Sequence, residues 1–119
     1  MITITIAHLM EAQPALERLA GERLPVKTAH HIAQLLRVAR PEIEQFVEQR
    51  SALIRELGAA REGGNVIEVT AENRAVFFEK VTELARVELQ LAVDPLAIAA
   101  LDGAELTAAD LMALDRFLV

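Results

Sequence analysis

Apolar side chains recur every three or four residues through the middle of the chain, the pattern of a helix that packs one face against a neighbour. We call this set the apolar row, although one of its positions is an arginine. The row consists of Ile32, Leu36, Ala39, Ile43, Phe46, Arg50, Leu53 and Leu57. A second row flanks it and consists of Val26, Ala33, Arg40, Val47 and Ile54. Pro25 suits a first helical turn and Gly58 a helix end, so we predict one long helix over about residues 25–57. The apolar row keeps its phase across Pro41, which favours a bend there over a break.

Two short segments alternate between apolar and polar residues, as strands with one buried face do. The first segment carries Ile2, Ile4 and Ile6, separated by threonines. The second, residues 87–93, carries Val87, Leu89, Leu91 and Val93, separated by Glu88, Gln90 and Ala92. A strand alone leaves its backbone groups unpaired, so we expect these two segments to pair in one small sheet.

Two more helices and a turn are predicted between these segments. Residues 7–20 place Leu9, Leu16 and Leu19 on one face, and Pro14 predicts either a kink or a split into two helices. Thr70 is a suitable N-cap for a helix over residues 71–86. Its apolar stripe consists of Val76, Phe77, Val81 and Leu84. Before it, Gly63, Gly64 and Asn65 form a turn signal, followed by an extended stretch with Val66, Ile67 and Val69.

The last part of the chain predicts a short helix. Residues 96–101 fit either an extended segment or a short helix, and Asp102 with Gly103 marks a turn. Thr107 and Asp110 have the spacing of a capping box, which places a helix start there. That helix carries Leu111, Leu114 and Leu118 on one side. The chain of 119 residues is thus predicted to be a single α+β domain, mostly helical. A long antiparallel helix hairpin packs on the small sheet, and a short C-terminal helix completes the fold.

Composition narrows the classes of function. The net charge of −6 disfavours binding to nucleic acid or to anionic membranes. The aromatic side chains are four Phe, with no Trp or Tyr, which leaves little for stacking on bases or sugars. The absence of Cys excludes thiolate catalysis and disulfides. No apolar stretch reaches the length of a membrane span, and the start lacks a signal-peptide pattern. We expect a cytoplasmic protein with no cofactor and no small-molecule substrate.

Several segments resemble a family of small proteins encoded by tailed phages and prophages. The residues that carry the resemblance are 24–29 (LPVKTA), 41–46 (PEIEQF), 48–50 (EQR) with Leu53, 87–89 (VEL), 106–111 (LTAADL) and 113–114 (AL). The resemblance covers most of the chain and keeps the order of its elements, although residues 59–65 form a less charged turn than the family would suggest. The family's function is not established and it brings no catalytic residues. The resemblance implies a viral accessory or virion-assembly role, in the host cytoplasm or with the virion.

The polar residues do not form a predicted catalytic or metal site. His30 and His31 are adjacent on a predicted helix, point about 100° apart and so cannot share one metal ion, while His8 lies elsewhere. Glu44 and Glu48 are interpreted as part of a solvated helix face, because nothing suggests a pocket that would shift their pKa values.

Arg50 falls within the apolar row, where a guanidinium must be paired or must extend past its neighbours to water. An ion pair with Glu79 or Glu83 of the following helix, fixing the helix register, is the favoured interpretation. A hot spot for a protein partner is the second. The candidate interaction and structural residues are Leu36, Ile43, Phe46, Arg50, Leu53 and Leu57.

These features predict a non-enzymatic interaction protein of phage origin that contacts virion components through helix faces. There is more apolar helix surface than one partner helix can cover, so self-association, as a homodimer, is also predicted. An alternative is a small inhibitor or adaptor that binds a host protein. An enzyme or small-ligand binder ranks last, since no catalytic, phosphate-binding or dinucleotide motif is found.

Overall fold

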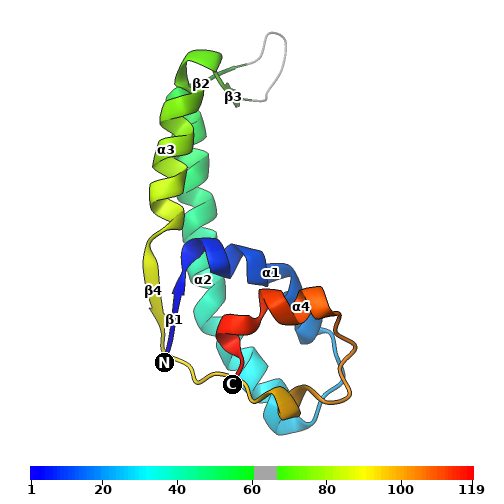
Figure 1. Cartoon of the computed structure of the whole chain (residues 1–119). Coiled ribbons are helices and arrows are strands. Elements are labelled where there is room, and N and C mark those ends of the chain that lie inside the picture. The colour runs from blue at the N-terminus through cyan, green and yellow to red at the C-terminus, as the bar shows by residue number, and fades with distance from the viewer. Residues whose placement is uncertain (61–66) are drawn as a thin grey trace.

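The computed structural model describes residues 1–60 and 67–119 (Figure 1). The helices and strands are β1 (Ile2–Thr5), α1 (Ile6–Ala20), α2 (Val26–Leu57), β2 (Gly58–Ala60), β3 (Ile67–Val69), α3 (Arg74–Ala85), β4 (Glu88–Leu91) and α4 (Ala108–Ala113). Three short 3-10 helices are η1 (Ala71–Asn73), η2 (Ile98–Leu101) and η3 (Asp115–Phe117). The turn expected at Gly63, Gly64 and Asn65, and the extended Val66, lie outside the described residues. The predicted fold class is confirmed: a mostly helical α+β chain with a long helix, a small sheet and a short C-terminal helix.

The two alternating segments pair as predicted. β1 and β4 are antiparallel, with Ile2 opposite Leu91 and Ile4 opposite Leu89. Ile2, Ile4 and Leu91 are buried, so one face of this sheet contributes to the core. The strand ends where Thr5 caps α1, because the Thr5 hydroxyl accepts a hydrogen bond from the His8 amide.

Both interior prolines lie within continuous helices. α1 passes through Pro14 without splitting, and α2 passes through Pro41 without dividing. Pro14 and Pro41 are both exposed, so water can hydrate the carbonyl that each deprives of an amide donor. Pro25 is the N-cap of α2 and Gly58 its C-cap, as the sequence predicted to within one residue.

The core forms where α1 packs on the N-terminal half of α2, where α4 packs on α1 and where η3 packs on β1. The apolar row is buried from Ile32 to Phe46. Leu35, Leu96 and Phe117 are also completely or almost completely buried, although the sequence analysis did not single them out. Residues 96–101 combine the two alternatives left open, since Leu96 bridges to Leu118 before the 3-10 helix η2 begins.

Beyond Phe46, α2 leaves the core and projects from the rest of the molecule. The last turns of α2 run antiparallel to α3, away from the rest of the molecule (Figure 1). We call residues 47–60 and 67–87 the arm and the remaining described residues the body. Among residues 47–58 and 68–87, none is buried. The radius of gyration is 17.3 Å, whereas a compact domain of this length has about 13–14 Å. A second two-stranded sheet, β2 with β3, lies at the far end of the arm; β2 was not predicted.

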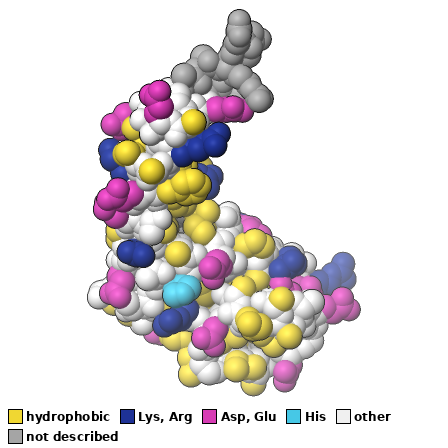
Figure 2. Space-filling model, turned by 45° about the horizontal axis from the view of Figure 1, so that its top comes forward, with side chains coloured by type: hydrophobic (Ala, Val, Ile, Leu, Met, Phe, Trp, Pro, Cys, Tyr) yellow, Lys and Arg dark blue, Asp and Glu magenta, His cyan; other side chains and the backbone are white. Residues whose placement is uncertain are grey.

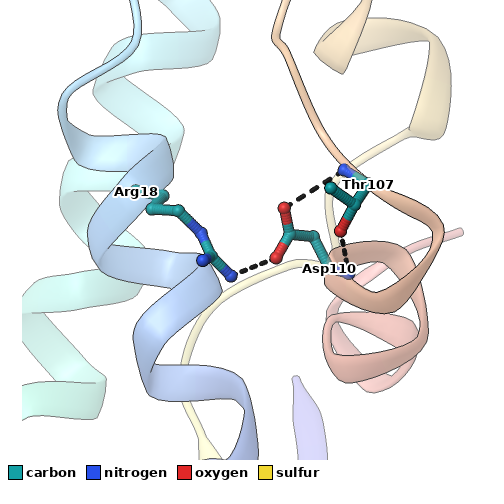
Figure 3. Close-up of polar contacts among 3 residues, drawn as sticks. All are labelled: Arg18, Thr107 and Asp110. Carbon is teal, nitrogen blue, oxygen red and sulfur yellow. Dashed lines mark hydrogen bonds and ion pairs between the residues drawn. The ribbon is translucent and has the colours of Figure 1, made fainter.

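A buried carboxylate joins α1 to α4. The predicted capping box is present: the Asp110 amide donates to the Thr107 hydroxyl, and the Thr107 amide donates to the Asp110 carboxylate. The other carboxylate oxygen accepts a hydrogen bond from the Arg18 guanidinium (Figure 3). Asp110 is the only buried charged side chain among residues 1–58 and 68–119. The helix start and the helix packing therefore depend on the same side chain.

An exposed ion pair joins α1 to α2 beside Pro41. The Arg40 Nε lies 3.1 Å from Glu17 Oε1 and the Arg40 Nη2 lies 2.8 Å from Glu17 Oε2, a two-point contact. Chiefly through these hydrogen bonds, Arg40 lowers the pKa of Glu17 below its ordinary value of 4.5. The same contact raises the pKa of Arg40.

This pair predicts a defined pH dependence. Because folding depresses the Glu17 pKa, its stabilisation is complete above the unfolded-state pKa and is lost as the pH falls through the folded one. In a carboxyl NMR titration, Glu17 should titrate below 4.5, and Arg40→Gln should return it to its ordinary value. Arg37→Gln, which removes an exposed cation from the same helix, should leave the Glu17 titration in place. An unchanged Glu17 curve in Arg40→Gln would contradict the assignment.

Candidate protein-interaction surface

The arm exposes apolar side chains although it is only two helices thick. Val47, Val76, Phe78 and Val87 are all exposed, and Phe78 is 66% exposed. The side chains that face the partner helix, such as Phe77, Val81 and Leu84, are only partly covered. Figure 2 shows apolar side chains along the arm among charges of both signs. A layer of two helices cannot enclose a core of its own, so these residues lack a covering layer in the described structure.

A groove runs between the two helices of the arm, with a volume of about 590 Å³. Its lining from α2 is Gln49, Ala52, Leu53 and Glu56, and its lining from α3 and the following residues is Lys80, Glu83, Leu84 and Val87. In each set the spacing is three, one and three residues, which places the four α2 residues on one face of α2 and Lys80, Glu83 and Leu84 on one face of α3, with Val87 just beyond its end. Across the arm, Lys80 Nζ lies 3.9 Å from Glu56 Oε1. The groove thus has an apolar floor and charged edges.

Apolar side chains of the arm and of the body surround one small pocket at the base of the arm. This pocket, of about 140 Å³, has apolar lining from Ile6, Phe46, Leu84, Val87 and Leu89. Phe46 is buried and ends the covered part of the apolar row. The arm therefore begins directly after Phe46, the last buried residue of α2.

The structure divides the candidate residues named from the sequence into two groups. Leu36, Ile43 and Phe46 are buried within the body and serve the core. Leu53 and Leu57 are half-buried in the arm, and Leu53 lines the groove. Only the second group is available to a partner.

The favoured prediction for Arg50, an ion pair with Glu79 or Glu83, was wrong, and its side chain instead extends to water, the other possibility named for it. Arg50 is exposed, and none of the ion pairs between described residues joins it to Glu79 or Glu83. Its guanidinium carbon instead lies 5.9 Å from the centre of the Phe46 ring. The physical reason is that α2 has already left the body at this position, so the side chain reaches water along an aromatic face without needing a carboxylate.

Two of the three histidines, His8 and His31, take part in polar contacts. His8 Nδ1 lies 3.0 Å from the Thr5 hydroxyl, and His31 Nε2 lies 2.7 Å from the Asp94 carbonyl oxygen. His31 also borders an open cleft of about 690 Å³ beside the end of β4. Within residues 1–60 and 67–119, no three His, Asp or Glu side chains are grouped so as to hold a metal ion.

Over the same residues, no helix combines the length and the apolar character that crossing a bilayer demands.

Charge differs between the arm and the body. The arm carries five Lys or Arg and six Asp or Glu, whereas the body carries six and eleven. Nearly all of the net charge of −6 therefore belongs to the body. A nearly neutral surface with mixed signs favours a partner that is itself close to neutral.

The arm helices were predicted from the sequence, but the groove between them was not. The signal was present in the repeated spacing of residues 49, 52, 53 and 56 and of residues 80, 83, 84 and 87, but these positions mix apolar and charged side chains and so were not grouped.

Compared with known proteins, the chain matches no described family, no curated protein and no solved structure.

Proposed function

We propose that this protein is a non-enzymatic interaction module that binds a protein partner through its arm, in the assembly of tailed-phage particles or as an accessory to them. The observation that carries the proposal is that α3 has no buried residue although it includes Val76, Phe77, Phe78, Val81 and Leu84. Apolar side chains held in this way on a projecting element mark an interaction surface.

Helix energetics support this interpretation. α3 has 12 residues, a length at which an isolated helix is marginal in water. Its stability must come from packing of its apolar face, and α2 covers that face only in part. A protein partner of matching shape would supply the missing cover.

The phage setting is supported by the sequence resemblance, and the arm fits a role that uses contacts in place of chemistry. The body provides a base with a full core, and the arm provides a surface that remains free until a partner arrives.

The first experiment compares two exposed apolar side chains in the replicating element that encodes the protein. Phe78→Ser removes a 66% exposed ring from the arm, and Met112→Ser removes a 78% exposed side chain from the body as its matched control. We expect the arm variant to reduce the yield of particles at least about tenfold, as loss of an aromatic hot spot does, while the control retains the wild-type yield. Equal yields from the two variants would overturn the assignment of the arm.

A second measurement identifies the partner. A photo-crosslinking amino acid in place of Phe78 should capture a virion protein, whereas one in place of Met112 should not. Capture of a host protein from position 78, with no trace of the chain in purified virions by mass spectrometry, would instead show an inhibitor or adaptor.

A further inference from the structure

We infer that the arm's groove is occupied by the arm of a second copy of this chain, so that the two arms together form a four-helix bundle. The inference rests on the proposed function, because it takes the arm as the interaction surface and names what covers its groove, while Phe78, which does not line the groove, stays available to the virion partner. A two-fold axis running parallel to the arm would relate the copies, as in most homodimers.

The shape of the groove suits an identical layer. Ala52, Leu53, Leu84 and Val87 form its apolar floor, and Ala52 leaves room for close approach of a second backbone. Two such helix pairs, stacked groove to groove, reproduce the two layers around one core that four-helix bundles have. The bundle would cover the half-buried Leu53 and Leu84 and the exposed Val87 of both copies.

The charges on the groove edges of one copy are complementary to those of a second copy. Lys80 and Glu56 lie at the same height on the arm, since their side chains are 3.9 Å apart. A two-fold axis parallel to the arm preserves height and places α3 of each copy over α2 of the other. Each Lys80 would then lie beside the Glu56 of both copies, and positive and negative side chains would alternate around the bundle.

The distribution of charge also favours a second copy over a strongly charged partner. With five cations and six anions, the arm offers no net attraction to a nucleic acid or to an acidic or basic peptide. The other arm of a dimer has the same near-neutral balance. It is therefore a partner in which Lys80 and Glu56 each meet the opposite charge of the other copy.

Sedimentation velocity of the purified full chain tests the first requirement. Across micromolar to submillimolar concentrations we expect a species of twice the 13.0 kDa mass of one chain. Leu84→Glu, which places a carboxylate on the groove floor, should give the monomer. A wild-type protein that stays monomeric over the whole range overturns the inference.

A charge-swap experiment tests the contact itself. Lys80→Glu leaves only carboxylates among the charged groove side chains, and Glu56→Lys combined with Glu83→Lys leaves only ammonium groups. Each variant alone should dimerise at least about tenfold more weakly than wild type, because like charges face each other. An equimolar mixture of the two should form a one-to-one dimer.

Arg23→Glu provides the control, since it changes net charge as Lys80→Glu does but lies in the body. It should dimerise like wild type, and circular dichroism should show the same helix content for every variant. If the mixture does not recover the dimer, the groove is not the self-contact. A monomeric wild-type protein whose Phe78→Ser variant still loses particle yield would remove this inference while leaving the proposed function standing.

Discussion

Replacing Phe117 by Ala should lower the free energy of unfolding by about 3–5 kcal/mol, the usual cost of deleting a buried aromatic ring. Phe117 is 0% exposed and belongs to the core cluster with Leu96 and Leu114. Its carbonyl oxygen also accepts a hydrogen bond of 2.7 Å from the Leu96 amide. Since small domains are stable by only about 5–15 kcal/mol, the variant should unfold at a much lower urea concentration, measured by circular dichroism.

Phe78→Ala is the matched control for that experiment. It deletes the same ring from a position that is 66% exposed, where the described neighbour is an edge-on contact with Phe77 at 6.1 Å between ring centres. The expected loss is about 0.5–1 kcal/mol. Comparable losses in the two variants would show that residues 115–119 do not pack into the core as described.

Asp110→Ala should cost about 2–3 kcal/mol in the free energy of unfolding, because one carboxylate serves both a helix cap and an interhelix ion pair. Its loss leaves the Thr107 amide without the carboxylate and removes the partner of Arg18. The estimate is below that of a fully buried ion pair because Arg18 is more than half exposed and can return to water.

A double-mutant cycle with Arg18→Gln separates these two roles. Arg18→Gln alone should destabilise by about 1–2 kcal/mol, since it leaves a carboxylate that is 5% exposed with less compensation. Adding Arg18→Gln to Asp110→Ala should lower the free energy of unfolding by at most about 0.5 kcal/mol more, because Asp110→Ala has already removed the contact. Additive losses would mean that Arg18 and Asp110 do not act on each other.

Features specified by local rules were predictable from the sequence. Alternation alone placed β1 and β4 and their pairing, since a one-residue slip would turn Ile2 and Ile4 to the wrong face. The Thr107 and Asp110 spacing gave the start of α4, and Gly58 gave the end of α2. Each of these signals lies within a few residues of the feature that it determines.

Burial was less predictable, because spacing shows which residues share a face and not what covers that face. Leu36 and Leu53 belong to the same apolar row, yet Leu36 is buried and Leu53 is only half-buried. The difference arises because α1 lies beside the first half of α2 and does not reach the second. The wrong prediction of an ion pair for Arg50 has the same cause, since the spacing did not show that this part of α2 is uncovered.

The candidate site was predictable only in outline. The apolar surplus on the helices predicted a protein contact, and for the arm surface this stays a prediction. The groove required the relative rotation of α2 and α3, which brings Glu56 opposite Lys80. That rotation depends on tertiary packing and on the β2 and β3 pairing, for which β2 gave no sequence signal.

The pairing of β1 with β4 has a consequence for synthesis on the ribosome. β1 is made before its partner, residues 88–91, so its backbone and the apolar faces of Ile2 and Ile4 must wait until those residues have been made. At about 5–20 residues per second, that wait is on the order of ten seconds. During that time α1 and α2 can already pack, and the nascent chain leaves the exit tunnel with an unpaired strand edge, the kind of segment that chaperones protect.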